Sequence, residues 1–125
     1  MSHYDNLYCK LFIHTDMDKN SLVGLVCSIV TGTKEATRTI VTDFSEIDIL
    51  KNEDFDIEKT NNRDGFLFYR YYLDIEPRNH ADKDEKKYMS SVAELLQCLW
   101  DLGFNAVCAC DFEGELPNIG GNIPD

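Results

Sequence analysis

The segment that decides the fold is Phe66–Glu76, which reads Phe-Leu-Phe-Tyr-Arg-Tyr-Tyr-Leu-Asp-Ile-Glu. Its side chains divide into two alternating sets, as in a strand whose successive residues point to opposite faces of a sheet. One set is Leu67, Tyr69, Tyr71, Leu73 and Ile75, and the other is Phe66, Phe68, Arg70, Tyr72 and Asp74. Pro77 ends the pattern. We therefore predict one long strand near the centre of a sheet.

Two helices are predicted, one on each side of this strand in the chain. The second has apolar residues at helical spacing and a stop at Gly103; its stripe is Tyr88, Val92, Leu95, Leu96, Leu99 and Leu102. Acidic residues precede it, where the helix dipole favours anions: Asp82, Asp84 and Glu85. The first helix covers the apolar stripe Leu22–Val30, with Asp18 as its N-cap and Gly32 as its stop.

Three further strands are predicted. Leu7–His14 alternates with period two, Thr37–Asp43 is rich in β-branched residues, and Asn105–Asp111 follows the second helix. Phe44–Leu50 either extends the second strand past a bend or forms a short extra one, and Asn52–Gly65 is a long loop or hairpin connection.

The resulting order is β-α-β-β-α-β, the split pattern of ferredoxin-like sandwiches. We predict a single α+β domain with a four-stranded antiparallel sheet and both helices on one face. Its ordered core covers about 7–117, and 118–125 forms a tail. The other face then carries Phe68, Arg70 and Tyr72, a row that suits a protein interface. The alternative is that the loop 52–65 or a second copy of the chain covers this row.

The chain is strongly acidic, with 23 Asp and Glu against 12 Lys and Arg and a net charge of −11. No Lys or Arg occurs after Lys87. Such a surface repels phosphate backbones, which argues against direct nucleic-acid binding, and it attracts basic proteins. The simpler interpretation is that the charge only maintains solubility.

No catalytic signature is found, and we expect neither an enzyme nor a bound cofactor. The five cysteines lack the paired spacing of a zinc site and are predicted to be reduced thiols. There is no apolar run long enough for a membrane span and no basic region followed by an apolar one at the N-terminus. We expect a cytoplasmic protein. Its oligomeric state does not follow from the sequence, and a monomer is the favoured interpretation.

Two groups of carboxylates were considered as sites. Asp111, Glu113 and Glu115 would project to one side of an extended segment at intervals of roughly 7 Å. The calcium-loop pattern is missing, so no metal is expected, and a partner-facing acidic edge or a solvated end are the remaining interpretations. His14 with Asp16 and Asp18 suggests a base or metal ligand, although turn and N-cap roles explain both acids.

The segments Tyr-Tyr-Leu-Asp-Ile-Glu-Pro (71–77) and Cys-Asp-Phe-Glu-Gly-Glu-Leu-Pro-Asn-Ile-Gly-Gly (110–121), together with the helix between them, resemble a family. The chain is similar over 66–121 to small acidic immunity proteins encoded beside bacterial polymorphic toxins, including those of contact-dependent growth inhibition systems. The resemblance implies a protein that binds and neutralises a cognate toxin domain, often a nuclease.

The leading hypothesis is therefore an immunity protein that binds a basic, nuclease-type toxin domain through acidic surface residues. The predicted partner-binding residues are Asp111, Glu113, Glu115, Asp54, Asp56, Glu58, Arg70 and Tyr72. The alternative hypotheses are a small domain that binds a ligand or metal through His14, Asp16 and Asp18, and an adaptor for another basic protein.

Overall fold

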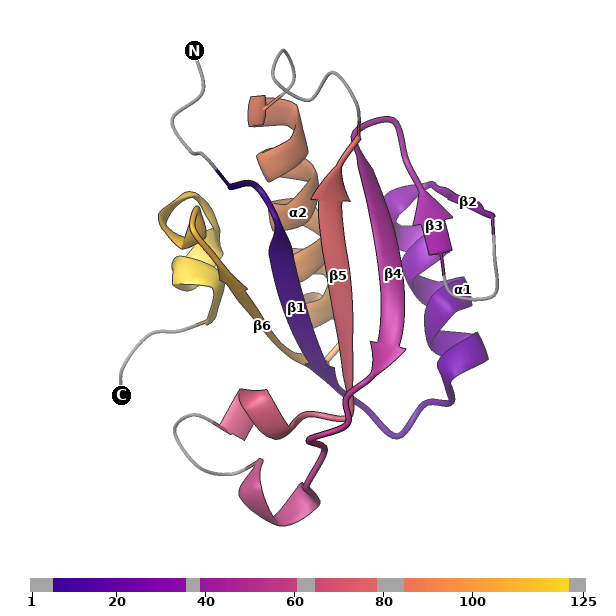
Figure 1. Ribbon diagram of the computed structural model, residues 1–125, viewed down its shortest axis with the longest axis vertical. Coiled ribbons are helices and arrows are strands. Elements are labelled where there is room, and N and C mark those ends of the chain that lie inside the picture. Colours follow the sequence, from indigo (N-terminus) through magenta and orange to yellow (C-terminus); the bar gives the residue numbers. More distant parts are fainter. Residues whose placement is uncertain (1–5, 36–38, 61–64, 79–84, 122–125) are drawn as a thin grey trace.

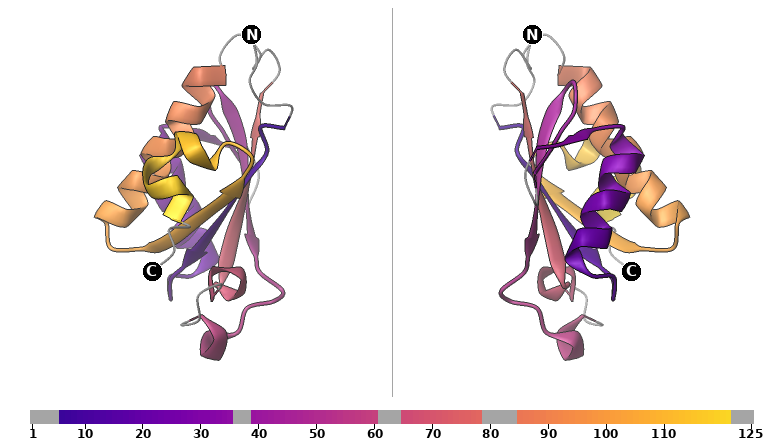
Figure 2. Two further views of the ribbon diagram at one scale, coloured as in Figure 1. Left: turned by 90° about the vertical axis from the view of Figure 1, so that its left-hand side faces the viewer. Right: turned by 90° about the vertical axis from the view of Figure 1, so that its right-hand side faces the viewer.

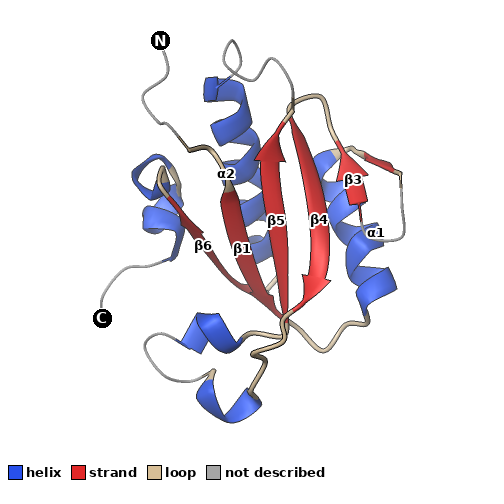
Figure 3. Cartoon of the chain, viewed as in Figure 1, coloured by secondary structure: helices blue, strands red, loops and turns tan. Residues whose placement is uncertain are grey.

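The computed structural model describes residues 6–35, 39–60, 65–78 and 85–121, which form one sheet with two helices packed on it (Figures 1 and 3). Both helices lie on the same face of the sheet (Figure 2). The helices are α1 (Lys19–Val30) and α2 (Glu85–Asp101). The strands are β1 (Cys9–His14), β2 (Thr33–Lys34), β3 (Thr39–Val41), β4 (Ser45–Lys51), β5 (Tyr71–Pro77) and β6 (Asn105–Cys110).

The sheet has six strands in the order β2-β3-β4-β5-β1-β6, and every neighbouring pair is antiparallel. The predicted α+β class with two helices on one face is confirmed, but the four-stranded ferredoxin-like sheet is wrong. Of the predicted second strand Thr37–Asp43, residues 37 and 38 lie outside the described residues, and the described part forms the short β3. Phe44–Leu50 corresponds to a separate strand, β4. The hydroxyl of Thr42 accepts hydrogen bonds from the backbone N–H groups of Phe44 and Ser45, which closes the turn between β3 and β4.

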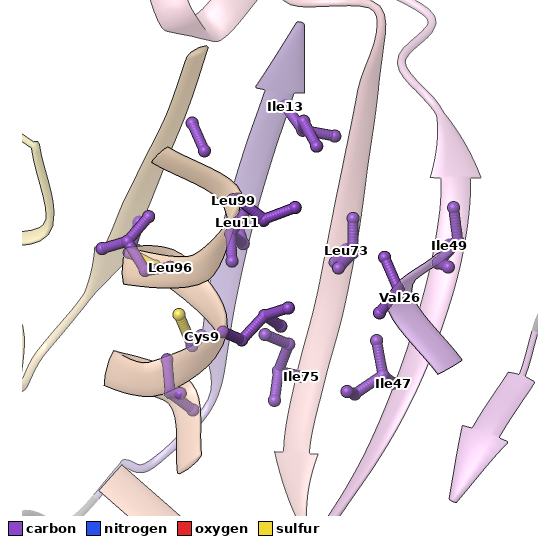
Figure 4. Close-up of a cluster of buried hydrophobic side chains, with 14 of the residues drawn as sticks. Cys9, Leu11, Ile13, Val26, Ile47, Ile49, Leu73, Ile75, Leu96 and Leu99 are labelled. Carbon is purple, nitrogen blue, oxygen red and sulfur yellow. The ribbon is translucent and has the colours of Figure 1, made fainter. Parts of the chain in front are cut away.

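The core lies between the sheet and the helices (Figure 4). Leu73 of β5 is at its centre, paired in register with Leu11 of β1 and Ile49 of β4, and all three side chains are fully buried. The helices contribute Leu22, Val23, Val26, Tyr88, Val92, Leu95, Leu96 and Leu99. The period-two and helical patterns of the sequence therefore identify most of the core.

The ends of the helices follow local chemistry. The Asp18 carboxylate accepts hydrogen bonds from the backbone N–H and the hydroxyl of Ser21, so the predicted N-cap is confirmed. These hydrogen bonds hold the pKa of Asp18 below its usual value. After α2, Gly103 turns the chain with a φ of 92°. Leu102 lies at this turn and is 55% exposed, so its predicted place in the buried stripe is wrong.

The long strand predicted over Phe66–Glu76 is wrong in its first half, because Gly65–Phe68 forms a 3₁₀ helix and β5 begins at Tyr71. In a strand, the backbone carbonyls of this segment would accept hydrogen bonds from the backbone of a neighbouring strand, but here two of them accept from a side chain instead. The side-chain amide of Asn52 donates to the carbonyls of Leu67 and Tyr69, at 2.9 and 2.8 Å. A second 3₁₀ helix, Ile57–Lys59, precedes this turn. We call residues 52–60 and 65–70 together the β4–β5 protrusion, which extends beyond the end of the sheet (Figure 1).

Gly65 is the tightest position of the β4–β5 protrusion. A Cβ atom there would lie 2.2 Å from the backbone oxygen of Thr60, a distance at which the backbone has to move. Gly65→Ala is therefore expected to lower the free energy of unfolding by about 1–3 kcal/mol, as overpacked sites do, measured by urea denaturation.

Gly24→Ala is the matched control, because a Cβ there meets nothing within 4 Å. Gly24 lies inside α1, where alanine is favoured by about 0.5–1 kcal/mol, so this variant should be slightly more stable than wild type. Equal effects of the two substitutions would contradict the close packing of Gly65.

Candidate protein-binding surface

Four carboxylates lie in two facing pairs on the sheet face away from the helices. Ile47 and Ile49 of β4 and Leu73 and Ile75 of β5 point into the core, so their neighbours along each strand point outward. The outward carboxylates are Glu46 and Asp48 on β4 and Asp74 and Glu76 on β5. The register sets Glu46 opposite Glu76 and Asp48 opposite Asp74. We call these four residues the acidic ladder.

Like charges directly opposite each other on adjacent strands destabilise a sheet. Two hydroxyl groups hold the inner pair of the acidic ladder in place. The Thr39 hydroxyl donates to the Asp48 carboxylate at 2.6 Å, and the Tyr8 hydroxyl donates to the Asp74 carboxylate. Partial burial of the phenol, followed by its hydrogen bond to Asp74, raises the pKa of Tyr8.

A single lysine lies beside the ladder on β1. Lys10 pairs in register with Asp74, and its Nζ atom lies 4.2 Å from the ring centroid of Tyr72 and 5.3 Å from that of Phe12. Tyr72 is thus on the outer face, as predicted. Phe12 is only 5% exposed although it points away from the helices, because Phe66 packs edge-on against its ring at 5.4 Å. This part of the outer face is therefore aromatic and partly covered, whereas Glu46 and Glu76 of the acidic ladder are exposed.

Arg70 and Phe68 do not form the predicted strand row with Tyr72, because both precede β5. The Arg70 guanidinium carbon lies 5.5 Å from the ring centroid of Phe55, and the Nζ atom of Lys59 lies 4.9 Å from that of Phe68. These contacts are within the β4–β5 protrusion. These contacts agree with the alternative that the loop 52–65 covers these residues, and cover by a second copy of the chain stays a prediction.

Asp54, Asp56 and Glu58 also belong to the β4–β5 protrusion. Asp54 and Glu58 are exposed, while the Asp56 carboxylate accepts a hydrogen bond from the backbone N–H of Glu58 at 3.0 Å and caps the 3₁₀ helix. One of the three predicted carboxylates thus has a structural role, and the other two are free to meet solvent or a partner.

Asp111, Glu113 and Glu115 lie at the other end of the sheet, beyond the last pair of β6, Cys9 with Cys110. The predicted extended row is wrong here. Glu113–Glu115 is a 3₁₀ helix, closed by hydrogen bonds from the N–H of Glu115 to Phe112 and from that of Leu116 to Glu113. Phe112 and Leu116, four residues apart, are both buried and draw the chain back onto the core. The two predicted acidic groups are therefore not brought together.

None of the five cysteines forms a disulfide, and three of them lie close together at the core. Cys9 lies opposite Cys110 in the sheet and contacts both Cys108 and Cys110. A hydrogen bond to Cys108, followed by burial, raises the pKa of the Cys9 thiol, and a hydrogen bond to Cys9, followed by burial, raises that of Cys110. Thiols of raised pKa are poor nucleophiles and poor metal ligands at neutral pH, so this cluster acts as apolar packing.

The alternative site at His14, Asp16 and Asp18 is not assembled. The His14 ring packs against Tyr69 at 5.3 Å and Phe55 at 6.2 Å between centroids, while Asp16 is exposed and Asp18 caps α1. Nδ1 of His14 is buried without a hydrogen-bond partner in the described structure. Across residues 6–35, 39–60, 65–78 and 85–121, no group of three or more His, Cys, Asp or Glu side chains is arranged to hold a metal ion.

A cavity of about 410 Å³ lies between the two helices and β4, with a mainly apolar lining. Three of its hydroxyl groups have partners within the protein: Ser91 donates to the Tyr88 carbonyl at 2.6 Å, and the Thr42 and Ser45 hydroxyls are paired at 2.9 Å. Thr31, Asp43 and Glu94 also line the cavity.

The acidic ladder was missed by sequence reasoning, although its signal is present. Glu46-Ile47-Asp48-Ile49 and Asp74-Ile75-Glu76 both alternate acid with isoleucine, which predicts two strands with acidic outer faces. The facing of the acids depends on β4 pairing with β5 in this register, which the sequence does not specify.

No protein-family model, curated protein or solved structure matches this chain. No helix among the described residues is of sufficient length and apolar character to cross a membrane.

Proposed function

We propose that this chain is a binding protein that recognises a basic protein through its acidic sheet face. The observation that carries the proposal is the acidic ladder, in which Glu46 faces Glu76 and Asp48 faces Asp74 on the face without helices. Facing carboxylates lower the stability of the free protein. A partner that places Lys or Arg between them removes this repulsion. The facing carboxylates therefore destabilise the free protein and stabilise its complex with a basic partner.

The net charge of −11 supports the same class of partner. A field of one sign concentrates oppositely charged proteins near the surface and raises their association rate. Nucleic acids are repelled by the same field. The ammonium group of Lys10, at the edge of the acidic ladder, lies over the rings of Tyr72 and Phe12. The carboxylates of the acidic ladder can therefore interact with basic side chains of a partner.

We further propose that the partner is a cognate toxin domain of the nuclease type, which this chain neutralises as an immunity protein. The support is the resemblance of 66–121 to immunity proteins of polymorphic-toxin systems, together with the chemistry of the ladder. A nuclease cleft holds phosphates with basic side chains, and a row of carboxylates held on a rigid sheet is suited to occupy such a cleft. Neutralisation then follows from exclusion of the nucleic acid.

The test is co-expression with the product of the gene adjacent to the gene for this chain. We expect that product alone to arrest growth, and we expect co-expression of this chain to restore growth and to yield a complex on purification. An unrelated acidic protein of similar charge serves as the control and should not restore growth. If the adjacent product is harmless, or if it is toxic and the chain fails to bind it, the immunity proposal is wrong.

A further inference from the structure

The β4–β5 protrusion presents apolar side chains to solvent. Five large apolar side chains are exposed among the described residues, and three of them belong to this unit: Phe55 at 38%, Ile57 at 56% and Leu67 at 44%. Exposed apolar residues gathered on one projecting element mark an interaction site more often than single scattered ones do.

The protrusion is held in shape by its own hydrogen bonds. Asn52 joins its two halves, because its side-chain amide donates to the carbonyls of Leu67 and Tyr69 and its side-chain oxygen accepts from the N–H of Asp54. The N–H of Asp56 also donates to the carbonyl of Phe68 at 3.1 Å. A contact element that is ordered before binding loses less conformational entropy on association.

Its position continues the candidate surface. Along β4 and β5, the pair Asp48–Asp74 is followed by the pair Leu50–Tyr72. The next backbone hydrogen bond, from the N–H of Asn52 to the carbonyl of Arg70, already belongs to the protrusion. Phe55 turns back toward the sheet and packs beside His14 of β1. A partner seated on the acidic ladder would therefore reach the protrusion without crossing to the helical face.

The charge of the protrusion indicates which side chains of a partner would surround its apolar residues. Residues 53–58 read Glu-Asp-Phe-Asp-Ile-Glu, so acids flank both apolar side chains. Glu53, Asp54 and Glu58 are exposed. The complement of this arrangement is an apolar pocket bordered by Lys or Arg.

We propose that Ile57, in the 3₁₀ helix of the β4–β5 protrusion, inserts into an apolar pocket with a basic rim on the partner protein, and that the exposed part of Phe55 lies against the edge of that pocket. This inference rests on the proposed function and deepens it, since it assigns binding strength to the protrusion and electrostatic attraction to the acidic ladder. Leu67 adds a third exposed apolar side chain, from the second half of the protrusion.

The test uses Ile57→Ala in the full chain and the product of the adjacent gene as the binding probe. Ile57 is chosen because the Phe55 ring contacts Arg70 and His14, so that its removal would also disturb the protrusion. Centrally placed apolar anchors dominate binding and act mainly on the dissociation rate. We expect dissociation to be about 30-fold faster, with the association rate, its salt dependence and the urea midpoint unchanged.

Leu102→Ala is the matched control, because Leu102 is 55% exposed at the end of α2, outside the protrusion. Its complex should dissociate at the wild-type rate. If wild-type chain binds the probe and Ile57→Ala dissociates no faster than Leu102→Ala, this inference is overturned and the proposed function stands. If wild-type chain does not bind the probe, the proposed function falls and the inference falls with it.

Discussion

Leu73→Ala is expected to lower the free energy of unfolding by about 2–5 kcal/mol, the range for removing a buried leucine side chain from a core. Leu73 is fully buried on the central strand β5, between Leu11 and Ile49. Neighbours on two strands and the helices above restrict how far the cavity can collapse, which favours the upper part of the range. Urea denaturation followed by circular dichroism measures the change, which is a large share of the about 5–15 kcal/mol typical of a domain.

Leu67→Ala supplies the comparison for this prediction. Both leucines were assigned to one face of one strand by the alternation of the sequence, but Leu67 is 44% exposed in the β4–β5 protrusion. Its truncation should change the free energy of unfolding by less than about 1 kcal/mol. Similar losses for the two variants would indicate that the strand begins at Phe66 after all.

The alternation around Leu73 shows what a sequence pattern can predict of this fold. Tyr71, Leu73 and Ile75 were assigned to the core correctly, because strand pairing and burial act on them in the same direction. The same period-two pattern continues back to Phe66, but this part of the chain is not a strand. Its Leu67 and Tyr69 carbonyls accept hydrogen bonds from the Asn52 side chain. A side chain fifteen residues distant from Leu67 decides that outcome, and local periodicity contains no information about it.

The edge of the sheet has a similar explanation. The β-branched segment before Asp43 predicts a strand, and β3 is one, but its length is limited by the turn that Thr42 closes with Phe44 and Ser45. Because the chain turns at Thr42, the residues that follow, with the acids Glu46 and Asp48 among them, form the separate strand β4. The predicted number of strands was wrong because β4 is separate from β3 and because the two-residue β2, which was not predicted, pairs with β3. The α+β class did not depend on the number of strands.

The sequence predicted correctly that the candidate surface is acidic, but it did not predict that this surface lies on β4 and β5. The acidic excess and the expectation of a helix-free sheet face came from the sequence, but the carboxylates chosen lay after β4 and after β6, at opposite ends of the sheet. Facing pairs such as Asp48 and Asp74 are 26 positions apart in the numbering and meet only through the β4–β5 register. A pairing between distant strands depends on tertiary structure, which composition and spacing do not encode.

Asp48→Asn with Asp74→Asn is expected to slow association with the basic partner about tenfold at low salt and to weaken the salt dependence of the association rate, measured by stopped-flow mixing. The free protein should become more stable by about 0.2–1 kcal/mol, since the facing repulsion is removed and the amide oxygens still accept from Thr39 and Tyr8. Asp111→Asn with Glu115→Gln removes the same charge from exposed residues at the far end of β6 and should leave the association rate nearly unchanged. An equal fall in the association rate for both double variants would mean that net charge alone attracts the partner, and the acidic ladder would then lose its assigned role.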